Sequence, residues 1–245
     1  MTAGTQNPYQ APSVAIDPPA AQLGGNVHSG VWGYQSARGA ASVTKVFLYI
    51  NAGIAALGLI TAAWAAVSMG GSPRTLAGVG NAATSLMAYG MISIVEIIGR
   101  LACAIPFCIW FYRAYANLRG LGNDFTAFAP GWAPGSFFVP FLNLVRPQQI
   151  AREIWTNSST DEASTNWGIV NRWWGFWIGG NIIAYVGSRV IGAGSFSAGL
   201  WIVAAASGLL CAAAITAASM VGRVERRQSE MAETLAQRAQ QQAAA

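Results

Sequence analysis

The chain has 245 residues, of which 53% are hydrophobic and only 9% are charged, and its formal net charge is +5. Soluble domains carry about 25% charged residues, so this composition predicts a membrane protein and excludes an ordinary soluble domain. The positive charge does not indicate nucleic-acid binding. The only small basic group, Arg223, Arg226 and Arg227, directly follows a predicted membrane span instead of lying on a folded polar face.

Residues 1–44 are polar, with scattered prolines and glycines and no sustained apolar period. We expect a disordered cytosolic tail without a cleavable signal peptide, because no basic start is followed by an apolar stretch. Residues 45–222 should form the membrane domain. Residues 223–245 should form a cytosolic C-terminal tail that is partly helical and exposed, because it is rich in Ala and Gln and has no strong apolar stripe.

Four apolar stretches are long enough to cross a hydrocarbon core of about 30 Å, which needs about 20 helical residues. They cover residues 46–69, 86–112, 173–191 and 200–221. The second should begin after a Gly-rich loop, continue as a helix to Gly120, and kink at Pro106. The fold class predicted is therefore an all-α integral membrane protein with four transmembrane helices.

The last two stretches carry small residues and tryptophans in recurring positions. Gly175 and Gly179 are spaced as G-x-x-x-G, and the fourth stretch repeats small residues every four positions at Ala204, Gly208 and Ala212. Such surfaces let helices approach closely in lipid, so a tight hairpin is expected. A group of tryptophans at the start of the third stretch is typical of a belt at the inner interface. It consists of Trp173, Trp174 and Trp177.

The segment 130–157 is apolar but is interrupted by prolines, so it either crosses the membrane, dips into it or lies on it. A crossing would put the two basic ends of the chain on opposite sides, against the preference of basic residues for the cytoplasm. We therefore expect a re-entrant or purely interfacial segment, followed by an amphipathic surface helix that starts with Pro147. Ile150 and Ile154 should share its apolar face, with Trp155 as an anchor. A dip would have to be enclosed by spans two to four.

Two motifs in this region resemble a known family. The stretch FCIWFYRAYANLRGLG is followed by PGWAPGSFFVPFLNLVRPQQIAREIW, and the pair is similar to the bacterial membrane family catalogued as domain of unknown function 4328. The resemblance covers roughly residues 45–220. It implies an integral membrane protein with no established activity, and it transfers no catalytic residue. The matching positions are Arg113, Asn117, Leu118, Gly122, Pro130, Trp132, Pro140, Asn143, Pro147, Glu153 and Trp155.

Glu96 and Arg100 lie inside the second span and are spaced to pair on one helix face. A charge near mid-span costs about 2.5–3.5 kcal/mol, so this pair should face the bundle. It either forms an ion or polar-substrate site near the midplane or fixes helix packing, with Arg189 as an alternative partner of Glu96. Packing is the preferred interpretation, because one pair in four spans makes a poor transport path.

Arg113 and Asn117 lie one turn apart near the cytoplasmic end of the second span. They are expected either to brace the proline-broken segment, by donating to its backbone or to Asn143, or to bind a lipid phosphate. Glu96 is the only carboxylate within the spans, and the only histidine, His28, lies in the N-terminal tail. We therefore expect no catalytic residue, no metal and no cofactor.

The sequence thus predicts a multi-pass protein of the inner membrane with both termini in the cytoplasm. The leading functional hypothesis is a non-enzymatic membrane scaffold that binds protein partners or lipids. The alternative is a small transporter or channel that uses Glu96 and Arg100. Expected partners are membrane lipids, together with other proteins or further copies of the same chain.

Overall fold

The computed structural model describes residues 33–71, 75–123, 126–158 and 166–244. This part of the chain is all helical and contains no strand, which confirms the all-α prediction. Its elements are α1 (Arg38–Gly70), α2 (Leu76–Gly120), α3 (Trp132–Gly135), the 3-10 helix η1 (Leu142–Leu144), α4 (Arg146–Asn157), α5 (Gly168–Gly192) and α6 (Phe196–Ala244). Three of them, α1, α2 and α6, are long and apolar enough to cross a membrane. The chain is therefore a multi-pass membrane protein.

The helices extend further than the predicted spans. α2 begins at Leu76, ten residues before the expected start, and Thr75 caps it by accepting a hydrogen bond from the backbone N–H of Gly78 at 3.1 Å. The Gly-rich stretch before the second span is therefore helical from Leu76, contrary to the expected loop. α2 ends at Gly120, as predicted. α6 continues without a break to Ala244, far beyond the expected end of the last span at residue 221.

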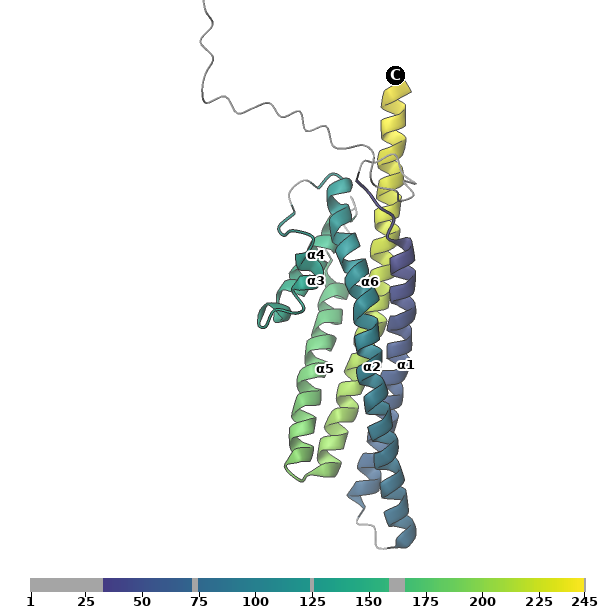
Figure 1. Ribbon diagram of the computed structural model, residues 1–245, viewed down its shortest axis with the longest axis vertical. Coiled ribbons are helices and arrows are strands. Elements are labelled where there is room, and N and C mark those ends of the chain that lie inside the picture. Colours follow the sequence, from purple (N-terminus) through teal and green to yellow (C-terminus); the bar gives the residue numbers. More distant parts are fainter. Residues whose placement is uncertain (1–32, 72–74, 124–125, 159–165, 245) are drawn as a thin grey trace, which may run out of the picture.

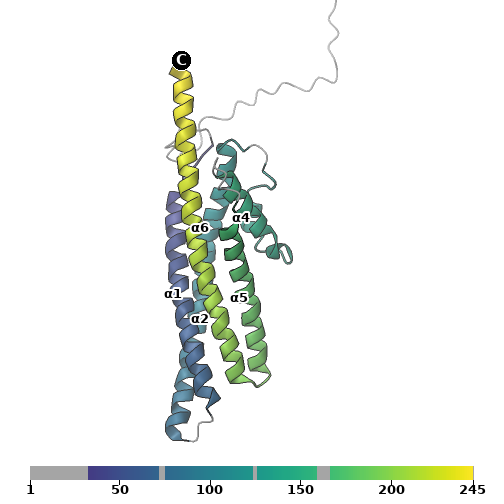
Figure 2. The ribbon, with the colours of Figure 1, turned by 180° about the vertical axis from the view of Figure 1, so that it is seen from behind.

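The four long helices run along the long axis of the molecule (Figures 1 and 2). They pack in the order α2, α1, α6 and α5. α1 packs along α2 on one side and along α6 on the other, and α6 packs in turn along α5. α2 makes few contacts with α6 and hardly any with α5. The start of α1, the end of α2, the start of α5 and the part of α6 beyond residue 221 lie at the same end of the molecule (Figure 1).

α5 and α6 form the predicted hairpin, but through other glycines than the G-x-x-x-G pair. A Cβ on Gly187 would lie 3.1 Å from the backbone oxygen of Gly199, and one on Gly199 would lie 2.9 Å from that of Gly187. By contrast, nothing lies within 4 Å of a Cβ on Gly175. The backbones of the two helices therefore touch at Gly187 and Gly199, where any larger residue would separate them.

An aromatic cluster joins the last part of α2 to the start of α5. The rings of Phe107 and Trp173 lie 5.8 Å apart, and Phe137, from the segment between α3 and α4, meets both Phe107 and Trp177 edge to face. Trp173 and Trp174 are only 4% and 5% exposed. The predicted interfacial belt is therefore wrong for these two tryptophans, which pack in the protein core.

Candidate functional site

The intramembrane pair forms on α2 as its spacing predicts. A terminal N–H of Arg100 donates to Oε2 of Glu96 at 2.6 Å, one helical turn away. The side chain of Glu96 is only 11% exposed, whereas that of Arg100 is 43% exposed. The carboxylate is thus turned into the protein, and the guanidinium lies at its edge. Arg189 makes no ion pair with Glu96 in the described part of the chain.

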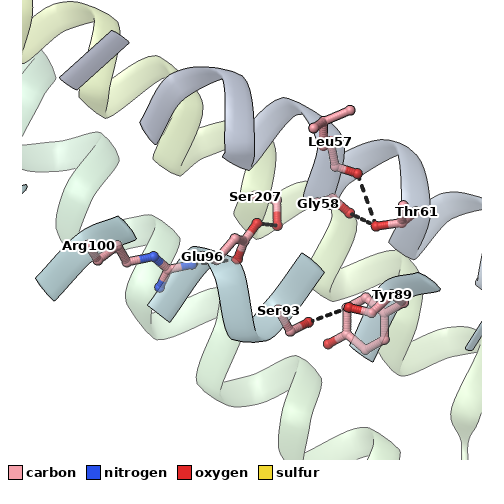
Figure 3. A network of polar contacts seen from close by, with 8 residues as sticks. All are labelled: Leu57, Gly58, Thr61, Tyr89, Ser93, Glu96, Arg100 and Ser207. Carbon is pink, nitrogen blue, oxygen red and sulfur yellow. Dashed lines mark hydrogen bonds and ion pairs between the residues drawn. The ribbon is translucent and has the colours of Figure 1, made fainter. Parts of the chain in front are cut away.

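Glu96 sits where three helices meet (Figure 3). Its Oε1 atom lies 3.5 Å from the hydroxyl of Ser207 on α6. On the α1 side the carboxylate lies against Gly58, at a point where a Cβ would overlap Oε1. Gly58 therefore makes the room that the carboxylate occupies. The pair joins α2 to α1 and α6, and its packed surroundings support a structural role.

Two further polar residues of α1 hold α2, and the sequence analysis did not single them out. The amide of Asn51 donates to the backbone oxygen of Gly99 at 3.0 Å, and the hydroxyl of Thr44 donates to that of Pro106 at 2.9 Å. Thr44 is fully buried. A polar residue in an apolar span is the signal that could have identified Asn51, because such residues bond across helices in lipid. Thr44 precedes the predicted first span, and the expectation of a disordered tail up to residue 44 is wrong from Arg38 onward, where α1 begins.

The proline-broken segment folds as α3, a series of turns, η1 and α4. Its apolar tip is not enclosed by spans two to four, contrary to the prediction for a dip. Phe138 and Phe141 are 76% and 84% exposed, and Leu144 and Val145 are about half exposed. The chain turns sharply at Phe141, whose φ of 64° is rare for a residue other than glycine.

The base of this segment is braced by Tyr115 and Glu153. The Tyr115 hydroxyl donates to Oε2 of Glu153 at 2.9 Å and accepts from the backbone N–H of Phe128 at 2.9 Å. Oε1 of Glu153 accepts from the backbone N–H of Ala127 at 2.8 Å. At the other end, the indole N–H of Trp174 donates to the backbone oxygen of Leu144 at 3.2 Å. Span two therefore holds the segment, as predicted, but through Tyr115.

The bracing role predicted for Arg113 and Asn117 is wrong. Arg113 is exposed and makes no hydrogen bond to the segment in the described part of the chain. Asn117 is 3% exposed and turns the other way. Its amide N–H donates to the backbone oxygen of Gln35 at 2.8 Å, and its oxygen accepts from the N–H of Gln35 at 3.1 Å. The lipid-phosphate role of Arg113 stays a prediction. For Asn143, the described part of the chain shows a hydrogen bond from its backbone N–H to the backbone oxygen of Val139 at 3.0 Å, and none from Arg113 or Asn117.

Asn117 belongs to a buried polar cluster that ties the extension of α6 to the membrane domain. Gln228, 1% exposed, donates through Nε2 to the backbone oxygen of Ala114 at 2.8 Å and to the hydroxyl of Ser158 at 3.1 Å. Its Oε1 lies 3.4 Å from Nδ2 of Asn117. The expectation of an exposed C-terminal tail is thus wrong for its first part. Nearby, burial raises the pKa of Tyr34, whose hydroxyl lies 3.5 Å from that of Ser229.

α4 starts at the predicted position, with Pro147 in its first turn, and its apolar face is buried against the protein. Ile150 and Ile154 are at most 1% exposed, and Trp155 is 3% exposed beneath the guanidinium of Arg227, 4.1 Å from the ring centroid. Trp155 is therefore a core residue, not the expected interfacial anchor. α4 covers the side of the bundle, with only its opposite face outward.

The positions that match the family motif divide between the core and the surface. Glu153 and Trp155 point inward and Pro147 is buried, whereas Trp132 and Pro140 are exposed. The model of a family described as "Domain of unknown function (DUF4328)" matches residues 74–226, which is more than half of the chain. The chain belongs to this family. The DUF4328 match begins just before α2 and ends in the extension of α6. No curated protein and no solved structure matches the chain.

Proposed function

We propose that this DUF4328 protein is a four-span protein of the bacterial inner membrane with both termini in the cytoplasm. α5 serves as the fourth span. It has 25 residues, about 37 Å at 1.5 Å per residue, and it packs along α6. The end of the molecule where α1 starts and α2 stops gathers most of the arginines, which supports its cytoplasmic placement.

Topology reporters give a direct test of this arrangement. A reporter fused after Ala245 should be active in the cytoplasm, and one inserted at Ser72, between α1 and α2, should be active in the periplasm. A C-terminal reporter active in the periplasm would overturn the four-span topology. A second insertion after Gly194, between α5 and α6, tests α5 separately, because it should also be periplasmic only if α5 crosses.

We infer that the protein acts as a non-enzymatic scaffold whose α3–α4 unit is a fixed platform at the cytoplasmic face. The observation that carries this proposal is the contrast between the two sides of the unit. Its inner side is fastened by Tyr115, Glu153 and Trp174, while its tip presents Phe138 and Phe141 outward. Large exposed apolar side chains on a braced frame are typical of surfaces that bind a partner or a membrane.

The proposal includes no catalytic reaction. Glu96 is the only carboxylate in the predicted spans, and within them no hydroxyl or thiol residue is adjacent in sequence to a carboxylate or a histidine. The alternative of a transporter or channel rests on Glu96 and Arg100. The packing of Glu96 against Gly58 and Ser207 supports a dry structural pair better than an ion path.

The scaffold proposal is tested by purifying the protein from its native membranes after mild crosslinking and identifying what accompanies it. Proteins that accompany the wild-type chain should be lost from the variant Phe138→Ser/Phe141→Ser. They should be retained by Leu76→Ser, which changes an equally exposed apolar residue (94%) at the opposite end of the molecule. An identical set of proteins with both variants would contradict the platform role.

A further inference from the structure

α4 and the start of α5 run side by side in opposite directions and are joined by polar contacts along their length. The indole N–H of Trp167 donates to the hydroxyl of Thr156 at 3.0 Å. Further along, the amide of Gln148 donates to Oδ1 of Asn171 at 3.1 Å. The contact between Trp174 and the backbone oxygen of Leu144 completes the series. This pairing fixes the register of α4 along the axis of α5.

Two arginines lie at the middle of this pairing. Arg152 donates from Nε and from a terminal nitrogen to Oδ1 of Asn171, at 3.2 and 2.7 Å, and its guanidinium lies 5.1 Å from the ring centroid of Trp167. These contacts hold the guanidinium in place and leave other N–H donors available. Among the described residues, Arg172, next to Asn171, donates to the backbone oxygen of Gly168 alone, at 3.2 Å.

No carboxylate in the part of the chain that the structure describes balances these two charges. Within the described ranges, neither Arg152 nor Arg172 takes part in an ion pair. The only acidic residue of α4, Glu153, is turned inward to Tyr115. A guanidinium offers several donors in a plane, a geometry that matches the oxygens of a phosphate group. The surface therefore holds an oriented positive charge that no carboxylate among the described residues pairs with.

Exposed apolar side chains follow at the start of α4. From Arg152, α4 leads back past Gln148 and Arg146, whose guanidinium lies 4.5 Å from the ring centroid of Phe128, to Val145 and Leu144, which are 49% and 51% exposed. Along α5 the same direction leads from Arg172 into the span. Donors for a phosphate and exposed apolar side chains thus follow each other in the order in which a phospholipid carries its headgroup and its acyl chains.

We propose that the face formed by α4 and the first turns of α5 binds an anionic phospholipid, with its phosphate at Arg152 and Arg172 and its acyl chains along Leu144 and Val145. The orientation rests on the proposed topology, which places Arg172 at the cytoplasmic end of α5. The occupant is a lipid and not a soluble phosphate ester, because exposed apolar side chains lie further along the same helix from the arginines.

The experiment measures lipid binding to the full-length chain in a nonionic detergent by native mass spectrometry. Phosphatidylglycerol should bind more tightly than phosphatidylcholine with the same acyl chains. The variant Arg172→Gln removes a charge without removing a contact between helices, and it should weaken phosphatidylglycerol binding by about tenfold, the loss expected for one charge-assisted contact. Arg152→Gln should act similarly, and its unfolding midpoint reports whether the loss of its bonds to Asn171 changes the fold.

The matched control is Arg226→Gln, which removes the same charge from an exposed arginine on the extension of α6. It should bind phosphatidylglycerol like the wild type. Equal weakening by Arg172→Gln and Arg226→Gln would overturn the site, as would equal binding of the two lipids by the wild type. Displacement of phosphatidylglycerol by free glycerol 3-phosphate would also overturn it, because the site would then be one for soluble phosphate esters. The scaffold proposal is tested on proteins, so either can fail alone.

Discussion

Replacing Glu96 with alanine should destabilise the membrane domain by about 2.5–3.5 kcal/mol, the cost of an unpaired charge near mid-span. The substitution removes the carboxylate that holds Arg100 at 2.6 Å and leaves the guanidinium without an ion-pair partner in the described part of the chain. Unfolding of the purified protein by dodecyl sulfate in mixed micelles measures this loss. The double variant Glu96→Ala/Arg100→Ala should lose much less, because it removes both charges together.

Substitution of Gly58, with and without Glu96→Ala, tests whether the carboxylate of Glu96 lies against this glycine. A methyl group at this position would collide with Oε1 of Glu96, so Gly58→Ala should cost about 1–3 kcal/mol in the wild-type background and little in the Glu96→Ala background. Gly53→Ala is the control on the same helix, because nothing lies within 4 Å of a Cβ there. If Glu96→Ala is no more destabilising than the double variant, the pair does not hold the helices.

Replacing Gln228 with leucine should cost about 1–3 kcal/mol, because the buried amide of Asn117 and the hydroxyl of Ser158 each lose a partner. The change should also act locally, by releasing the extension of α6 from the ends of α2 and α4. Hydrogen exchange of the α6 amides beyond Gly222 should then speed up, while exchange within the span stays slow.

Gln237→Leu is the control for this experiment. Gln237 lies on the same helix, one to two turns from the end of the packed part, and is exposed. The control should therefore leave both the stability and the exchange pattern unchanged. Unchanged exchange in the Gln228→Leu variant would mean that the polar cluster does not fasten the extension.

Local sequence patterns predict the structural features that depend on residues close together in the sequence. The spacing of Glu96 and Arg100 predicts their pair, and Pro147 marks the start of α4, because both follow from the geometry of a single helix. Gly120 as the end of α2 belongs to the same class. The apolar face of α4 was also predicted from the spacing of Ile150 and Ile154.

Contacts between distant residues leave no such periodic signal. Tyr115 meets Glu153 across 38 positions, and Gln228 meets Asn117 across 111, and neither pair has a characteristic spacing. The tail that follows the last span is polar, so its own sequence does not predict burial. Gln228 is buried because α2 and the end of α4 pack against it. Trp155 and Trp173 were assigned to the interface, since composition alone does not distinguish a tryptophan at the headgroups from one in the core.

The order in which the helices pack constrains how the chain assembles. α1 precedes the other helices described, yet one of its two neighbours is α6, which follows them all in the sequence. Ser197, at the start of α6, donates to the backbone oxygen of Ala66 near the end of α1, at 2.8 Å. α1 and α2 can associate early as a hairpin, and α5 and α6 can do so late. The contact between the hairpins forms only after α6 has been synthesised, so a chain that stops before α6 leaves one side of α1 without its neighbour.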